Sequence, residues 1–169
     1  PSSTACMVAP LVTKVSVYIM VRVMLSVFGM EYVAALPWGE VIVWLAVIGI
    51  LGGSVMALSE PNLNRMLTWL IVADVGYMVG GAWLANENGM IGTIYHVISD
   101  AAMTSCLFLA VTILIAKSGS TKIESLTGAF QKHPLTMVAL VIGAFSMIGI
   151  PPTAGFFSKY YLVRGGLES

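Results

Sequence analysis

Five ionisable side chains interrupt the apolar segments of this 169-residue chain, and all five are of types that can bind and release protons. They are Lys14, Asp74, His96, Asp100 and Lys159. A Lys or Asp at the centre of a membrane helix costs about 2.5–3.5 kcal/mol on insertion scales, so such groups should face one another or water. Burial favours the neutral form of a lysine, whereas a neighbouring carboxylate favours its charged form. A lysine held between these influences can exchange protons near neutral pH, and a row of such groups is a candidate proton relay.

Spacing places three polar residues on one face of a predicted helix. His96, Asp100 and Thr104 follow one another at intervals of four, and residues so spaced lie above one another on a helix. Tyr95 and Ser99 lie one position to the side. The remaining residues are mostly apolar, so the pattern predicts a single polar stripe along an apolar helix.

Each of these residues also has a structural interpretation. Lys14 can form a structural ion pair or extend toward the membrane interface, and His96 can be a packing histidine. Asp74 can pair with a neighbouring helix, and Lys159 can lie at a membrane edge. A sixth candidate, Glu40, begins an apolar segment beside two tryptophans. This setting indicates an interfacial position, with a relay role as the alternative.

Composition indicates the elements that must position these groups. Hydrophobic residues make up 58% of the chain and charged residues only 9%, against about 25% charged in soluble domains. A bilayer core about 30 Å thick needs about 20 apolar residues per helix. We therefore predict an all-α, polytopic transmembrane helical bundle of five to six helices, forming a single transmembrane domain over residues 1–169. The predicted helices are 7–28, 41–58, 67–84, 90–116, 135–150 and 153–165. We expect this domain to be part of a longer subunit.

Prolines predict two interrupted helices, each with a lysine close to the interruption. Pro10 lies four residues before Lys14, and Pro151-Pro152 precedes Lys159. A proline removes one backbone hydrogen bond and can break a helix. Broken membrane helices line the ion sites of many transporters, so these two positions are candidates for such sites.

Other classes of chemistry lack a motif in this sequence. Eight basic and eight acidic residues cancel, so nothing indicates a nucleic-acid partner. Cys6 and Cys106 have no metal-ligand spacing and read as small buried hydrophobes. Motifs for flavin, iron–sulfur or nucleotide binding are missing, so we predict no cofactor, no metal and no redox site. Whether the chain belongs to an enzyme complex stays open on these grounds.

Three stretches resemble the antiporter-like membrane subunits of respiratory complex I, Mrp-type Na⁺/H⁺ antiporters and membrane hydrogenases. Residues 9–18 read APLVTKVSVY and resemble the family stretch LLTKVGVYALLR. Residues 62–67 read NLNRML and, with Gly76-Tyr77, resemble DLKRLLAYSS followed by GY. Residues 149–159 read GIPPTAGFFSK and match the family motif closely. The resemblance covers nearly the whole chain.

The resemblance implies a role for several residues. Members are longer proteins built from two inverted halves, and this chain resembles much of the second half. Lys14 would be the central lysine of a broken helix, protonated and deprotonated during transport. Lys159 would be the lysine near the second break, on the exit side of the proton path. Glu40 falls near a position where the family holds a Lys or His between those two.

The family pattern HxxxHAxxKxxLF is altered at residues 96–108. His96 is kept, but Asp100 stands where the second histidine is expected and Thr104 where the lysine is expected. Asp74 occupies a position that is usually neutral or histidine, and Asn62-Leu63-Asn64 lacks the two charges of DLK. Either Asp100 supplies a new carboxylate to the relay, or the subunit no longer conducts.

We therefore predict a proton-translocating, antiporter-like subunit of an NADH:quinone oxidoreductase-type or Mrp-type complex. Na⁺/H⁺ exchange and a non-conducting scaffold are the alternatives. The expected partners are other membrane subunits, the lipid bilayer and H⁺ or Na⁺. The expected location is a prokaryotic plasma membrane, with an organelle inner membrane as the alternative.

Overall fold

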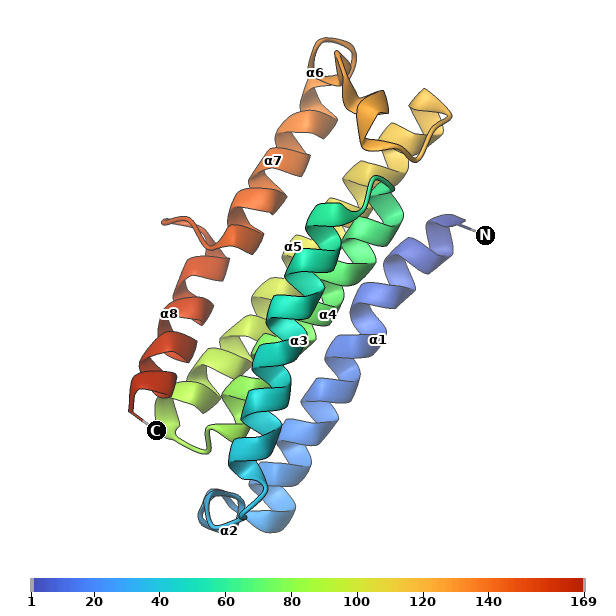
Figure 1. Cartoon of the computed structure of the whole chain (residues 1–169). Coiled ribbons are helices and arrows are strands. Elements are labelled where there is room, and N and C mark those ends of the chain that lie inside the picture. Colours follow the sequence, from blue (N-terminus) through green and yellow to red (C-terminus); the bar gives the residue numbers. More distant parts are fainter. Residues whose placement is uncertain (1, 169) are drawn as a thin grey trace.

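The computed structural model describes residues 2–168, which form an elongated bundle of six long helices running up and down (Figure 1). The long helices are α1 (Ser2–Val23), α3 (Gly39–Ser59), α4 (Leu63–Trp83), α5 (Glu87–Ser118), α7 (Pro134–Ile148) and α8 (Ala154–Leu167). A π-helical segment, η1 (Met24–Phe28), continues α1, and the remaining elements are α2 (Met30–Ala34), the 3₁₀ helix η2 (Ile123–Leu126) and α6 (Ala129–Lys132). Only an isolated bridge, and no strand, occurs in this described part of the chain.

The predicted all-α transmembrane bundle is confirmed. Four helices, α3, α4, α5 and the α1–η1 segment, are long and apolar enough to cross a membrane by length and composition. Helix α4 begins four residues earlier than predicted because Asn62 caps it, and α5 begins three residues earlier because Asn86 caps it. An asparagine side chain at this position accepts hydrogen bonds from backbone N–H groups that have no partner inside the helix.

The cap of α4 also fastens the loop between α5 and α7. Asn62 Oδ1 accepts from the backbone N–H groups of Asn64 and Arg65 at 3.1 and 3.3 Å. Its amide nitrogen donates to Thr121 Oγ1 at 2.9 Å, and Leu63 N donates to the Thr121 carbonyl at 2.8 Å. The two loops therefore meet at one end of the bundle (Figure 1).

We expect Asn62→Ala to lower the free energy of unfolding by about 1–2 kcal/mol, because it removes the cap and the bond to Thr121. Denaturant titration of the purified protein in detergent measures this change. Asn64→Ala is the matched control, because only the backbone N–H of Asn64 takes part in the cap. An equal loss in the two variants would contradict the capping role of the Asn62 side chain.

Helix α5 lies at the centre of the packing, against α1, α4, α7 and α8, while α3 packs along α4. Backbones approach closely where α3 crosses α4: a Cβ added to Gly53 would lie 2.9 Å from the nitrogen of Ala73. Small residues at such crossings are typical of membrane bundles, where close packing replaces the hydrophobic driving force. This packing holds α4 and α5 in a fixed position relative to each other, which is what a polar site between them requires.

Only one of the two predicted helix interruptions is observed. The interruption at Pro151-Pro152 is confirmed: α7 ends at Ile148, Gly149 adopts a left-handed conformation with φ of +90°, and α8 begins at Ala154. The interruption predicted at Pro10 is wrong, since α1 continues through it to Val23. A proline inside a helix removes a single backbone donor, and a helix can absorb that loss without ending. Lys14 therefore lies on an unbroken α-helical turn.

Candidate functional site

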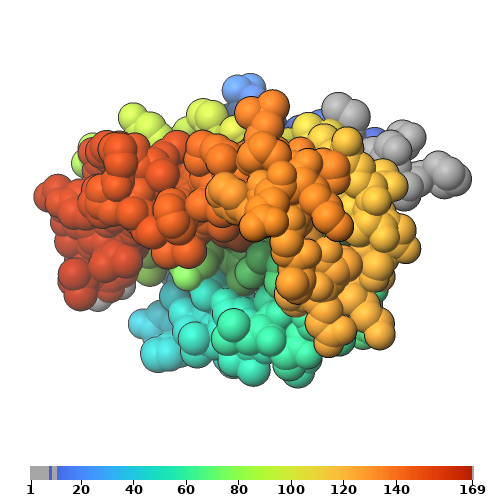
Figure 2. Space-filling model, turned by 90° about the horizontal axis from the view of Figure 1, so that it is seen from above, coloured from blue at the N-terminus to red at the C-terminus, as the bar shows by residue number. Residues whose placement is uncertain are grey.

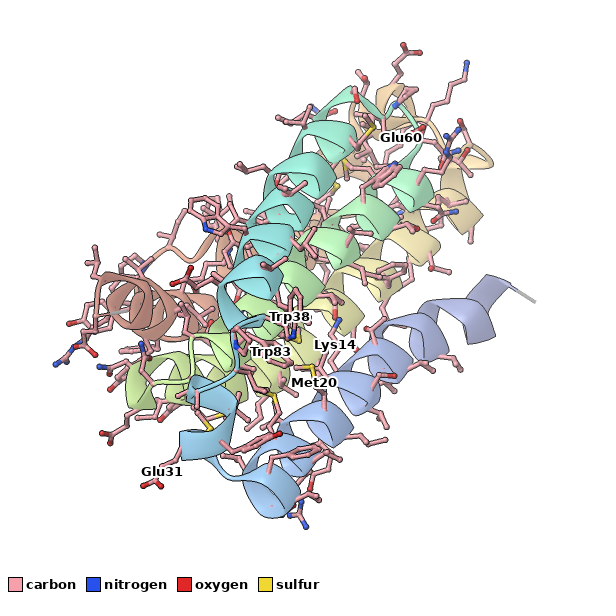
Figure 3. The ribbon with its side chains drawn as sticks, turned by 60° about the horizontal axis from the view of Figure 1, so that its bottom comes forward. Lys14, Met20, Glu31, Trp38, Glu60 and Trp83 are labelled. Carbon is pink, nitrogen blue, oxygen red and sulfur yellow. The ribbon has the colours of Figure 1, made fainter. Side chains whose placement is uncertain are left out.

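Four helices bring the five interior candidates into one region in the middle of the bundle. Lys14 comes from α1, Asp74 from α4, His96 and Asp100 from α5, and Lys159 from α8. Lys14 extends from α1 toward the rest of the bundle (Figure 3), and only 4% of its surface is exposed. Asp74, His96 and Asp100 are also buried, and Lys159 is half-buried. We call these five residues the polar cluster.

Lys14 and Asp100 form an ion pair inside the bundle. Lys14 Nζ lies 2.7 Å from Asp100 Oδ2, and the Asp100 side chain is fully buried. Charges taken out of water are tolerated when they are paired, so each residue compensates the other. The hydroxyl of Thr104, one turn further along α5, donates to the Asp100 backbone carbonyl at 2.5 Å and leaves the carboxylate to Lys14. The polar stripe predicted on this helix is therefore buried.

His96 bridges α4 and α8. Its Nδ1 lies 3.0 Å from Ser158 Oγ, and its Nε2 lies 3.8 Å from Asp74 Oδ1. Ser158 donates its one hydroxyl proton to the Gly155 carbonyl at 3.0 Å, so the consistent assignment has His96 Nδ1–H donating to Ser158 Oγ. Nε2 then faces Asp74. A proton can pass between this nitrogen and the Asp74 carboxylate after a small approach of the two groups.

Lys159 is held by backbone and an aromatic ring rather than by a carboxylate. Its Nζ donates to the Met147 carbonyl at 2.5 Å, in the last turn of α7. Carbonyls at a helix C-terminus lack helical partners and carry partial negative charge, so they stabilise a cation. The same nitrogen lies 4.8 Å from the ring centroid of Tyr77, which contacts His96 edge to face at 5.6 Å.

A cavity of about 390 Å³ leads from the polar cluster toward the end of the bundle where the loops meet. Asp74, Tyr77 and Lys159 line one part of it, and Ile123 and Leu126 of η2 line another. Most of the other lining residues are apolar side chains of α4, α5 and α7. Figure 2 shows a hollow in this end of the molecule, between α3–α4 (teal to green) and α7 with its loop (orange).

Glu40 lies apart from the polar cluster. It is exposed in the first turn of α3 and lines a separate cavity of about 970 Å³ with Trp44 and Trp83. It forms no ion pair with any cluster residue in the described part of the chain. The structure therefore does not bring Glu40 together with the other five candidates.

Two members of the site were missed by the sequence reasoning. Tyr77 follows Asp74 by three residues, a spacing that places both on one helical face and was available as a signal. Ser158 has no comparable signal, because its contact with His96 spans 62 residues of sequence. No group of three or more His, Cys, Asp or Glu side chains within residues 2–168 is arranged to hold a metal ion.

The sequence matches, over residues 1–169, a family model described as NADH:quinone oxidoreductase/Mrp antiporter, transmembrane. The chain belongs to this NADH:quinone oxidoreductase/Mrp antiporter family. It is 40% identical over 169 residues to the NADH-quinone oxidoreductase subunit N of Desulforudis audaxviator, covering 100% of this chain and 34% of that protein. It is 32% identical over 149 residues to the NAD(P)H-quinone oxidoreductase subunit 2 of Trichormus variabilis, covering 88% and 28%.

A solved structure shares the fold of this member of the NADH:quinone oxidoreductase/Mrp antiporter family. It is the membrane-bound sulfane sulfur reductase, an archaeal respiratory membrane complex, with a TM-score of 0.84 and 21% identity. The match covers 98% of this chain and 34% of that one. The chain thus spans about a third of the length of the proteins it matches. The resemblance seen in the sequence is confirmed at the level of family and fold, and the chain is an integral membrane protein.

Proposed function

We propose that this chain is part of a proton-translocating, antiporter-like subunit of a respiratory NADH:quinone oxidoreductase-type or Mrp-type complex. The observation that carries the proposal is the polar cluster: five proton-exchanging side chains lie in the interior of a membrane bundle, where charges are costly and mark ion pathways. Family membership supports the same conclusion. Redox chemistry would belong to other subunits, and the chain would contribute ion movement.

The contacts suggest an order for the proton path. Protons would reach Lys159 and Asp74 through the cavity beside η2. They would pass between Asp74 and His96, whose facing atoms are 3.8 Å apart, and then through Asp100 to Lys14. His96 and Asp100 lie one turn apart on α5, so this helix would carry the central part of the path.

The proposed setting is a multisubunit complex in a prokaryotic plasma membrane. The bacterial relatives are named as subunits of quinone oxidoreductases, which supports partner subunits in the membrane. Within the proposed complex, a change of charge in a neighbouring subunit would bias the ion pairs of the polar cluster and so drive the protons electrostatically.

We expect Lys159→Met to reduce proton translocation by the assembled complex about tenfold or more, because it removes the proton carrier between the cavity and His96. Proton uptake into proteoliposomes measures the rate, and a native gel verifies assembly. Lys122→Met is the matched control, since Lys122 is exposed in the loop. Equal rates in the wild type and Lys159→Met would remove Lys159 from the path.

Na⁺/H⁺ exchange is a second candidate, favoured by one observation. Asp74 Oδ2 and Asp100 Oδ1 are buried without a hydrogen bond from the described residues, and buried carboxylate oxygens are ligands for hard cations. Proton flux measured with and without Na⁺ separates the two functions. Flux that is indifferent to Na⁺ would eliminate exchange.

A further inference from the structure

Asp100 differs in charge from the residue that the family pattern leads one to expect. The motif described above has a histidine here, and a histidine cannot neutralise a lysine. In this chain the position carries a carboxylate 2.7 Å from Lys14 Nζ, and both side chains are buried. The altered residue therefore makes a contact that the expected residue could not make.

The Lys14–Asp100 pair is also the charged attachment of α1 to the bundle. The other buried side chains of α1 and η1 within residues 11–28 are apolar: Val17, Val21 and Met24. They pack in a cluster with Met78, Ala82 and Met90. Arg22, the second cation of α1, is exposed and lies over the Tyr18 ring. Much of the surface of α1 faces outward, so its position depends on this narrow inner strip.

The other charged and titratable groups near the pair make contacts outside it. On α4, Asp74 Oδ1 lies 3.8 Å from His96 Nε2, and the Tyr77 ring faces Lys159 Nζ. On α8, Lys159 is bound to the Met147 carbonyl. Asp100 is therefore the carboxylate within ion-pair distance of Lys14 among the described residues.

We propose that Asp100, in addition to its place in the proposed proton path, has a positioning role: its ion pair holds Lys14 in the bundle interior and thereby fixes α1 against α5. The inference rests on the proposed function only for its consequence in transport. If protons pass through Lys14, each transfer must disturb the ion pair, so movement of charge is coupled to the docking of α1. Removing the carboxylate alone leaves a buried lysine without compensation, whereas removing both charges leaves none.

The test uses the assembled complex carrying Val21→Cys as a probe, since Val21 is only 6% exposed and faces the core from α1. Labelling of this cysteine by a membrane-permeant maleimide is followed by mass spectrometry of the peptide that contains position 21. We expect Asp100→Asn to raise the labelling rate about tenfold, because an unpaired buried charge weakens the docking of α1. Asn keeps the shape of the side chain and removes its charge.

Three further variants make the result specific. Asp100→Glu keeps the carboxylate and should label within about threefold of the wild-type rate. Thr104→Val changes the same face of α5 and removes a hydrogen bond to the Asp100 backbone only, so both charged groups of the pair stay and labelling should not change. If Asp100→Asn fails to assemble, the double variant Lys14→Met, Asp100→Asn should restore assembly, because neither charge remains.

Three outcomes would each overturn the proposal. Asp100→Asn could label at the wild-type rate, the Asn and Glu variants could label equally, or the double variant could fail to assemble. These readouts require no ion flux. A complex whose proton flux is insensitive to Lys159→Met would count against the proposed function, while the labelling would still decide the role of Asp100.

Discussion

Replacing Lys14 with alanine is expected to reduce proton translocation by the assembled complex at least about 100-fold, the usual scale for losing a positioned proton-transfer group. Lys14 is 4% exposed, lies in the bundle interior and contacts the Asp100 carboxylate at 2.7 Å. Alanine removes the carrier and also leaves Asp100 buried without its partner.

The measurement is proton uptake into proteoliposomes, with assembly verified on a native gel. Arg22→Ala is the matched control, since it removes a cation from the same helix at an exposed position. Full pumping by Lys14→Ala with intact assembly would reclassify the chain as a scaffold whose relay no longer conducts. Loss of assembly alone would be repaired by Lys14→Met combined with Asp100→Asn, and pumping in that double variant would then decide.

Replacing Gly155 with alanine is expected to have the second largest effect, through the fold. Its added Cβ would collide with the backbone carbonyl of Ser146, where the first turn of α8 lies against the last turn of α7. Backbone cannot move aside as a side chain can, so we expect a cost of about 3 kcal/mol. The α7–α8 break would open, and Ser158 and Lys159 would shift away from His96 and Met147.

The amount of assembled complex in the membrane and its thermal stability report this effect. Gly52→Ala is the control: it also adds a methyl group inside a helix, but nothing lies within 4 Å of its added Cβ. Equal stability of the two variants would contradict the tight α7–α8 contact.

The order of apolar and polar residues along the sequence predicted the helices and the polar stripe on α5, because both depend on hydrophobicity and on the helical repeat. The four-residue spacing of His96, Asp100 and Thr104 is a property of one helix, and all three are buried as expected. The contact between Asp100 and Lys14 depends on how α1 packs against α5, which no local pattern encodes. The same is true of Ser158, whose partner His96 lies on another helix.

The wrong prediction of a helix break at Pro10 has an equally specific cause. Pro10 is a helix breaker by local propensity, but α1 continues through it because one missing donor is a small cost against a membrane environment that favours helices. Glu40 was linked to the relay through the family resemblance, and it lies apart from the polar cluster, beside Trp44 and Trp83. The roles proposed for the polar cluster remain predictions until the variants above are measured.

The two lysines have different contact partners, so the two ends of the proposed proton path differ in what deprotonation leaves behind. Lys159 is bound directly to an uncharged carbonyl and a ring face, so loss of its proton leaves neither of these two partners as an unpaired charge. Lys14 is bound to a carboxylate, so loss of its proton leaves a buried anion without its ion-pair partner. Deprotonation of Lys159 therefore needs no further change in its two contact partners, whereas deprotonation of Lys14 requires a compensating charge near Asp100. A neighbouring subunit that supplies or withdraws that charge would control proton transfer at Lys14. Lys159 would continue to exchange protons with its cavity.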